Sequence, residues 1–204
     1  MNAEPAPQLC LVTPPAPESA RVAPRLAALL EAAPLPVACV RLATAGMDEA
    51  AIRAAAAWLR PLCHGHDVAL VIEDHFRLVA PLGLDGAHLL APRFLREARR
   101  EIGAGQILGA FCGSSRHAAM TAAEAGADYV ALGPFSMQGA LGPGRLAERD
   151  FAAWWAEVVE IPLVVEGLDA ESFAALSPLA DFLTLEARQW FDPAELDRLT
   201  GARA

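Results

Sequence analysis

The chain has 204 residues, of which 54% are hydrophobic and 20% charged, and its net charge is −9. This length suits one domain with a substantial core. The negative charge argues against nucleic acid or an anionic membrane surface as a partner, and no apolar run is long enough to predict a membrane span. All basic residues are arginines, so the chain has no lysine to form a Schiff base or bind a phosphate.

The start of the chain and its cysteines indicate the cellular compartment of the protein. Residues 1–8 are rich in alanine and proline and lack a basic region and an apolar core, so we interpret them as a disordered lead, not a signal peptide, before a single domain at 9–204. The four cysteines are irregularly spaced without a C-x-x-C pair. We therefore expect reduced, mostly buried thiols in a cytoplasmic protein without an organic cofactor.

Short apolar runs alternate about eight times with amphipathic stretches along the chain. The runs are almost continuously apolar, which is typical of strands buried on both faces. The predicted strands are Leu9–Thr13, Val37–Leu42, Val68–Ile72, Gly86–Leu89, Ile107–Ala110, Tyr129–Leu132, Leu163–Val165 and Phe182–Leu185. The predicted helices are Glu18–Ala32, Asp48–Cys63, Phe76–Leu82, Pro92–Ile102, Ser115–Ala125, Leu146–Val159, Asp169–Leu176 and Asp192–Thr200.

Eight strand-then-helix units in one chain predict a closed (β/α)8 TIM barrel, since open sheets usually have five or six strands. Asp85, Asp128 and Asp181 recur just before three of the predicted strands. In a barrel these positions lie at the amino ends of the strands, so we assign them a structural role, satisfying turn amides. Any active site is expected at the carboxyl ends.

Polar residues at the carboxyl ends give the candidate site. We take Arg41, Glu73, His88 and Cys112 as candidate catalytic residues. His88 ends an apolar strand, and a hydrogen-bonded core histidine is the favoured interpretation there. Asp74 is the candidate metal ligand, for Mg²⁺, although a helix cap is the favoured interpretation of this residue.

Two further segments at this end suit an anionic ligand. Ser114 and Ser115 precede a helix, whose first amides bind anions or are capped by the same residues. The stretch from Gly133 to Gly144 is dense in glycine and proline. A loop of this length predicts a lid over residues 134–145, and a disordered insertion is an equally good interpretation.

Five segments of the chain form a recognisable set: residues 10–13 read CLVT, 71–74 VIED, 85–89 DGAHL, 126–134 GADYVALGP and 161–165 IPLVV. Together they resemble the thiamine phosphate synthase and thiazole tautomerase (TenI-like) family of TIM barrels. At the corresponding places that family has LYLITD in its opening strand, then IIND, DGVHL, GADYVGVGP and IPVVA. Their order and spacing cover almost the whole chain.

The resemblance implies a reaction in thiamine biosynthesis. A pyrimidine methyl pyrophosphate loses pyrophosphate and a thiazole phosphate captures the resulting cation, which needs Mg²⁺ and positive groups. It implies a phosphate cup at Gly133, at Glu166-Gly167 and at Glu186. It also implies small-molecule ligands. A homodimer is one assembly that we leave open.

This sequence departs from the family pattern at the groups that handle phosphate. The family lysines after strand two and in the lid are absent, and Arg93 stands where a second metal-binding aspartate is expected. Glu166 and Glu186 replace a glycine and a serine-bearing turn, and ionised carboxylates there repel phosphate. Arg41 is the candidate replacement for one residue of the strand-two motif, whereas Arg116 and Arg145 would compensate only by swinging into the site.

These departures leave three functions open. The first is a thiamine phosphate synthase-like enzyme with weak or lost activity and weak Mg²⁺ binding. The second is a non-catalytic ligand-binding or regulatory barrel. The third is an enzyme on a different, less anionic substrate, since fold alone does not fix function.

Overall fold

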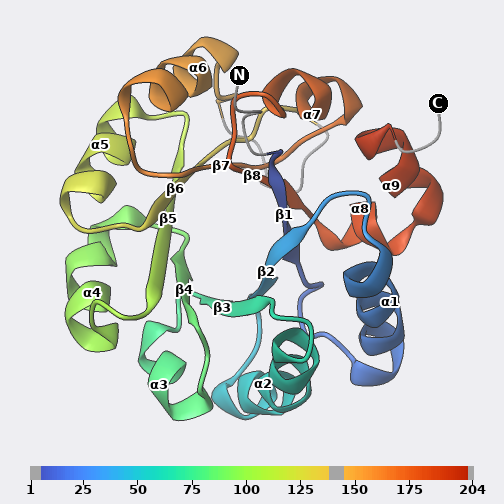
Figure 1. Ribbon diagram of the computed structural model, residues 1–204. Coiled ribbons are helices and arrows are strands. Elements are labelled where there is room, and N and C mark those ends of the chain that lie inside the picture. Colours follow the sequence, from blue (N-terminus) through green and yellow to red (C-terminus); the bar gives the residue numbers. More distant parts are fainter. Residues whose placement is uncertain (1–5, 138–144, 202–204) are drawn as a thin grey trace.

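The computed structural model describes residues 6–137 and 145–201, so most of the expected lead and most of the expected lid lie outside the described residues. Eight parallel strands form a closed barrel in chain order, in which β8 pairs with β1 (Figure 1). The strands are β1 Gln8–Val12, β2 Val37–Leu42, β3 Ala69–Glu73, β4 Gly86–Leu89, β5 Ile107–Gly113, β6 Tyr129–Leu132, β7 Leu163–Val165 and β8 Phe182–Leu185. The predicted TIM barrel is confirmed.

Helices surround this barrel on the outside (Figure 1). They are α1 Ser19–Ala32, α2 Glu49–His64, α3 Val79–Leu82, α4 Leu95–Ile102, α5 Arg116–Glu124, α6 Arg149–Val158, α7 Ala170–Leu176, α8 Ala187–Phe191 and α9 Pro193–Thr200. The 3-10 turns Phe76–Leu78 and Pro92–Phe94 precede α3 and α4. No described helix is long and apolar enough to cross a membrane.

The predicted elements agree with the structure except at a few places. Strand β5 extends to Gly113, beyond the predicted end at Ala110. Helix α8 was not predicted, because a helix of five residues is too short to show a periodic pattern. Its tryptophan, Trp190, is fully buried and donates to the Val12 carbonyl, which attaches the chain after β8 to the end of β1.

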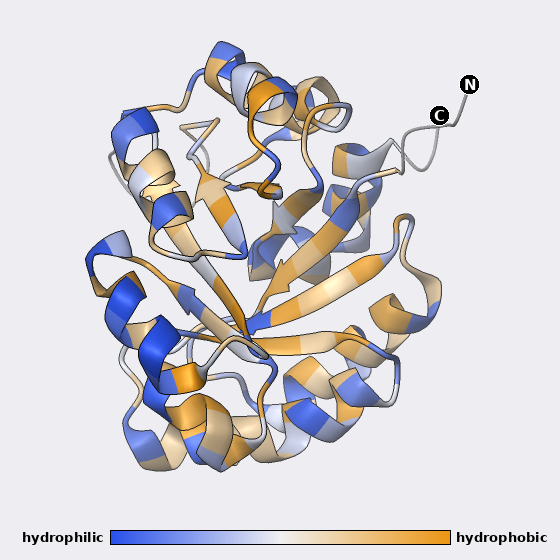
Figure 2. Ribbon diagram, turned by 60° about the vertical axis from the view of Figure 1, so that its left-hand side comes forward, coloured by the Kyte–Doolittle hydropathy of each residue, from blue (hydrophilic) through white to orange (hydrophobic). Residues whose placement is uncertain are grey.

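Successive residues of each strand face opposite sides of the barrel wall, as the two-residue period requires. Those facing outward, such as Leu9, Leu11 and Val40, are fully buried in a hydrophobic core between the strands and the helices. Figure 2 shows the apolar strands inside helices whose outer faces are hydrophilic. The residues that alternate with them, such as Cys10 and Arg41, face the barrel interior, and this second set builds the candidate site.

The three repeated aspartates have the structural role that the sequence predicts. Each lies just before an even-numbered strand and accepts a hydrogen bond from a backbone N–H of the preceding strand. The pairs are Asp85 with Leu70 at 2.7 Å, Asp128 with Leu108 at 2.7 Å, and Asp181 with Leu163 at 2.8 Å. The carboxylates therefore join β3 to β4, β5 to β6 and β7 to β8 at the amino end of the barrel.

Candidate functional site

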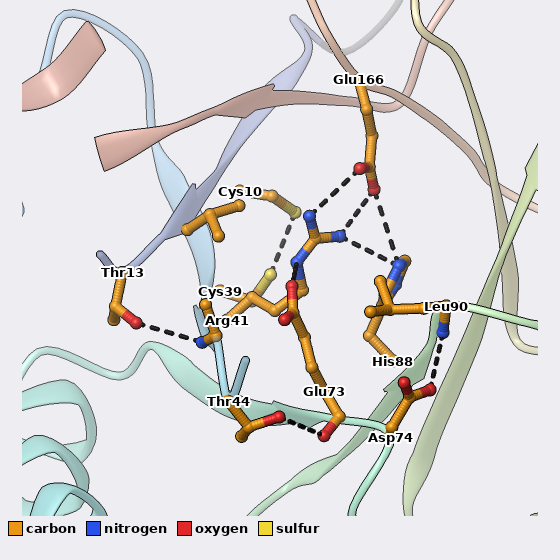
Figure 3. A network of polar contacts seen from close by, with 12 residues as sticks. Cys10, Thr13, Cys39, Arg41, Thr44, Glu73, Asp74, His88, Leu90 and Glu166 are labelled. Carbon is orange, nitrogen blue, oxygen red and sulfur yellow. Dashed lines mark hydrogen bonds and ion pairs between the residues drawn. The ribbon is translucent and has the colours of Figure 1, made fainter. Parts of the chain in front are cut away.

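A buried ionic network lies inside the barrel, near the carboxyl ends of the strands (Figure 3). The Arg41 guanidinium from β2 donates to Glu166, just after β7, with Nη1–Oε1 at 2.6 Å and Nη2–Oε2 at 3.1 Å. Its Nε forms an ion pair with Glu73 Oε1 of β3 at 3.1 Å, although the N–H direction does not give a hydrogen bond. The side chains of these three residues are 8%, 2% and 9% exposed, in that order. Bidentate pairing fixes the guanidinium between the carboxylates.

His88 of β4 extends the network toward the amino end. Its Nε2 lies 3.0 Å from Arg41 Nη1, and its Nδ1 lies 2.9 Å from the Tyr129 hydroxyl. A guanidinium only donates, so Nε2 accepts and Nδ1 carries the proton that is donated to Tyr129. Burial, and then the positive charge of Arg41, hold the pKa of His88 well below its usual range. The ring is neutral, and the prediction of a hydrogen-bonded core histidine is confirmed.

The charges of the network compensate one another only in part. Burial by itself lowers the pKa of Arg41, but the charge and hydrogen bonds of Glu166 outweigh it, so this pKa is raised and the guanidinium stays charged. Burial raises the pKa of Glu73, and the neighbouring Arg41 offsets part of that rise. One guanidinium thus pairs with two carboxylates. The positive charge of Arg41 is therefore balanced within the protein.

Asp74 does not form the expected cap, and the residues around it do not fit a magnesium site. It is exposed, with φ 54°, and its Oδ1 accepts from the Leu90 N–H at 2.8 Å. The next turn begins at His75 without a side-chain cap, so the favoured helix-cap interpretation is wrong. Arg93 stacks on Phe94, 4.7 Å from the ring centroid. Within the described residues, no three His, Cys, Asp or Glu side chains form a group that could hold a metal ion.

The two glutamates expected in the phosphate cup have different surroundings. The carboxylate of Glu166 points into the barrel toward Arg41 (Figure 3). Glu186 is the N-cap of α8, where its N–H donates to Gln189 Oε1 at 2.9 Å, and its Oε2 lies 3.4 Å from Arg188 Nε. Each of the two carboxylates thus has an arginine partner, Arg41 for Glu166 and Arg188 for Glu186.

In the expected phosphate cup, the backbone after β6 packs closely against the backbone after β7. A Cβ on Gly133 would lie 2.6 Å from the Glu166 carbonyl oxygen, so only glycine allows the chain after β6 to approach the chain after β7 this closely. The Gly167 carbonyl accepts from the N–H groups of Phe135 and Ser136 at 3.2 and 2.9 Å. The segment after β6 is thereby attached to the end of β7.

The remaining candidates after β5 are not brought to the network. Ser115 caps α5 by accepting from the Ala118 N–H at 3.2 Å, and Ser114 lies half-buried before it. The Cys112 thiol lies in the hydrophobic core between strands and helices, and burial raises its pKa to about 12. Cys112 is thus a buried, protonated thiol that packs against apolar side chains.

The two arginines that the sequence offered as compensating phosphate ligands have partners on the outside. Arg116 stacks over the Trp154 ring at 4.0 Å from its centroid. Arg145 pairs with Glu148 at 3.1 Å. Neither contact belongs to the network around Arg41.

Sequence reasoning missed three interior residues, Tyr129, Cys10 and Cys39. Tyr129 fills space that Gly109 leaves open on the neighbouring strand, and the Cys10 and Cys39 sulfurs are 3.0 Å apart. The alternation of side chains along β1, β2 and β6 is the signal that places all three inside. Their mutual distances depend on strand register, which the sequence does not fix.

Comparisons with known proteins identify the family. The family model for thiamine monophosphate synthase matches residues 9–176. The thiamine-phosphate synthase of Rhodospirillum centenum is 42% identical over 190 residues, which covers 92% of this chain and 91% of that protein. The thiamine-phosphate synthase of Erythrobacter litoralis is 36% identical over 171 residues, covering 81% and 80%.

Solved structures agree at the level of fold. A thiamine phosphate pyrophosphorylase from Pyrococcus furiosus superimposes with a TM-score of 0.77 at 17% identity, covering 95% of this chain and 94% of that one. A tryptophan synthase α-subunit from the same organism gives a TM-score of 0.72 at 12% identity, covering 96% and 98%. From the family model and the curated relatives together, the chain belongs to the thiamine monophosphate synthase family of (β/α)8 barrels.

Proposed function

We propose that this protein is a thiamine phosphate synthase-type enzyme of thiamine biosynthesis whose coupling activity is weak. One observation carries the proposal: Arg41, the buried guanidinium near the carboxyl ends, is held by Glu166 and Glu73. In this role the protein acts on small molecules in the cytoplasm. We also propose that the protein forms a homodimer, to be tested together with its activity.

The chemistry explains why an occupied guanidinium matters. Departure of pyrophosphate builds negative charge that needs positive groups arranged in advance. This chain has no lysine, and its arginine at the centre of the site already serves two carboxylates. Losing one such contact costs roughly 3 kcal/mol of transition-state stabilisation, and two or three together slow turnover by roughly four to six powers of ten if additive.

The test is an assay of thiamine phosphate formation. Purified protein, Mg²⁺, the pyrimidine pyrophosphate and the thiazole phosphate are mixed, and the product is followed by fluorescence after oxidation. The Rhodospirillum centenum synthase, assayed in parallel, is the positive control. We expect this chain to be slower by several powers of ten, and comparable turnover of the two proteins would overturn the proposal of weak activity.

A second candidate function is favoured by the charge balance at the same end. Glu73, Asp74 and Glu166 lie there with Arg41, so the carboxylates of this group outnumber its cation. A less anionic substrate suits this balance. Titration with the pyrimidine alcohol and with its pyrophosphate separates the two functions: a synthase binds the pyrophosphate more tightly, and this second function requires the alcohol to bind at least as tightly.

A further inference from the structure

Two thiols meet inside the barrel, below the ionic network. Cys10 of β1 and Cys39 of β2 are register partners in the parallel ladder, and their sulfurs are 3.0 Å apart. Neither belongs to a disulfide. The other two cysteines, Cys63 and Cys112, lie in the hydrophobic core between strands and helices. The contact between thiols is thus specific to β1 and β2.

The backbone spacing at this pair is compatible with a covalent bond. Partners on neighbouring strands lie about 4.8 Å apart, and disulfides join Cα atoms that are roughly 4.4–6.8 Å apart. Both side chains already point into the same interior space (Figure 3). Closing the gap between the sulfurs needs a shift of about 1 Å, measured to the usual S–S length of about 2.05 Å.

A small cavity gives access to the pair. Its volume is about 100 Å³, and its walls include both thiols together with Ala69, Tyr129 and Phe182. Space of this size admits a molecule as small as hydrogen peroxide. Cys39 is half-buried whereas Cys10 is buried. The contact with Cys39, and then burial, raise the pKa of Cys10 well above its usual range. Because Cys39 is the more exposed of the two thiols, it is the sulfur placed to react first.

We propose that Cys10 and Cys39 form a reversible disulfide, driven by a peroxide, that links β1 to β2 inside the barrel. In the first step the Cys39 sulfur attacks one peroxide oxygen, the O–O bond breaks, and a sulfenic acid and one water form. In the second step the Cys10 sulfur attacks the Cys39 sulfur, the S–O bond breaks, and the leaving hydroxide takes the Cys10 proton as a second water. The peroxide gains the two electrons that the thiols lose.

The position of this bond connects it to the site. Arg41 follows Cys39 by two residues on the same face of β2, so the disulfide lies one layer below the guanidinium. A bond between adjacent parallel strands is constrained by the ladder, and strained disulfides are more easily reduced. Dithiol reductants therefore break the disulfide again. The bond forms and breaks directly below Arg41.

Peptide mapping after oxidation tests the proposal. Trypsin cuts this chain only after arginine, and the four cysteines fall into the separate peptides 1–21, 26–41, 54–77 and 101–116. After hydrogen peroxide treatment of the folded protein, we expect the intact mass to fall by two hydrogen atoms. We expect peptides 1–21 and 26–41 to be joined, and dithiothreitol to separate them and restore the mass.

Matched variants make the test decisive. Cys39→Ala and, separately, Cys10→Ala should abolish the cross-link, whereas Cys112→Ala should leave it unchanged. If either interior variant fails to fold, the wild-type peptide map still decides. Addition of oxygen atoms without cross-linking, or a cross-link that includes Cys63 or Cys112, would overturn the proposal.

Discussion

Tyr129 occupies the space that a side chain at Gly109 would need. A Cβ placed on Gly109 would lie 1.9 Å from the ring of Tyr129. The glycine on β5 therefore permits the tyrosine on β6 to extend across the interior, where its hydroxyl accepts a hydrogen bond from His88 Nδ1. We predict that Gly109→Ala destabilises the fold by at least about 1–3 kcal/mol, the usual cost of overpacking, measured by urea unfolding.

The control for this variant is another glycine. Gly105 is exposed, and nothing lies within 4 Å of a Cβ built on it. Gly105→Ala should change the unfolding free energy by less than about 0.5 kcal/mol. Equal effects of the two substitutions would show that Tyr129 does not fill the space beside Gly109.

Removing the charge of Glu166 should be costly. In Glu166→Gln, Arg41 remains buried with only the ion pair to Glu73. Leaving one member of a buried ion pair without its partner costs about 3–5 kcal/mol, and we expect a loss of that order in chemical denaturation. The matched control is Glu49→Gln on α2, whose pair with Arg53 is about half exposed and is worth about 0.5 kcal/mol. A small loss at Glu166 would mean that the network is not ionised as described.

The neutral state of His88 predicts acid sensitivity. Arg41, Glu73, Tyr129 and Glu166 face this ring or adjoin it, and the pKa of His88 is lowered in the folded state. Below a pH of about 6.5 the unfolded chain therefore binds a proton that the folded chain does not. Stability from this residue is complete above that pH and declines as pH falls, by up to about 1.4 kcal/mol per unit.

Unfolding midpoints at three pH values between 7.5 and 5 measure this slope. His88→Gln should reduce it, whatever its effect on stability at neutral pH. Burial raises the pKa of Glu73, which acts in the opposite direction, since the folded state then binds its proton first. Glu73→Gln should therefore steepen the decline. An unchanged slope in His88→Gln would contradict a buried neutral imidazole.

Magnesium should bind the free protein weakly. Asp74 is the candidate anchor, and one of its oxygens already accepts from the Leu90 amide. We expect calorimetry to give at most millimolar affinity, with the remaining binding lost in Asp74→Ala. Tight binding that persists in Asp74→Ala would show that other residues hold the metal.

The sequence predicted the barrel well because each strand repeats one local rule. Five of the eight strands have the bounds that their apolar runs indicate, and Asp85, Asp128 and Asp181 act as the repeat suggests. The sequence did not predict contacts that a long-range pairing decides. The family resemblance places Glu166 in a phosphate cup after β7, but its pairing with Arg41 on β2, 125 residues earlier, has no local signal. That pairing depends on barrel closure, which no local pattern encodes.

The three aspartate contacts at the amino end protect one backbone amide each from hydrogen exchange, at three separate junctions between strands. The amides of Leu70, Leu108 and Leu163 each donate to a carboxylate that arrives from the next strand, so exchange of their hydrogens with solvent requires adjacent strands to separate. Exchange rates at these amides therefore report on opening between β3 and β4, β5 and β6, and β7 and β8, one junction each. In Asp128→Ala, only the Leu108 amide should become faster to exchange while the other two keep their rates, which would make separate local openings of one barrel visible.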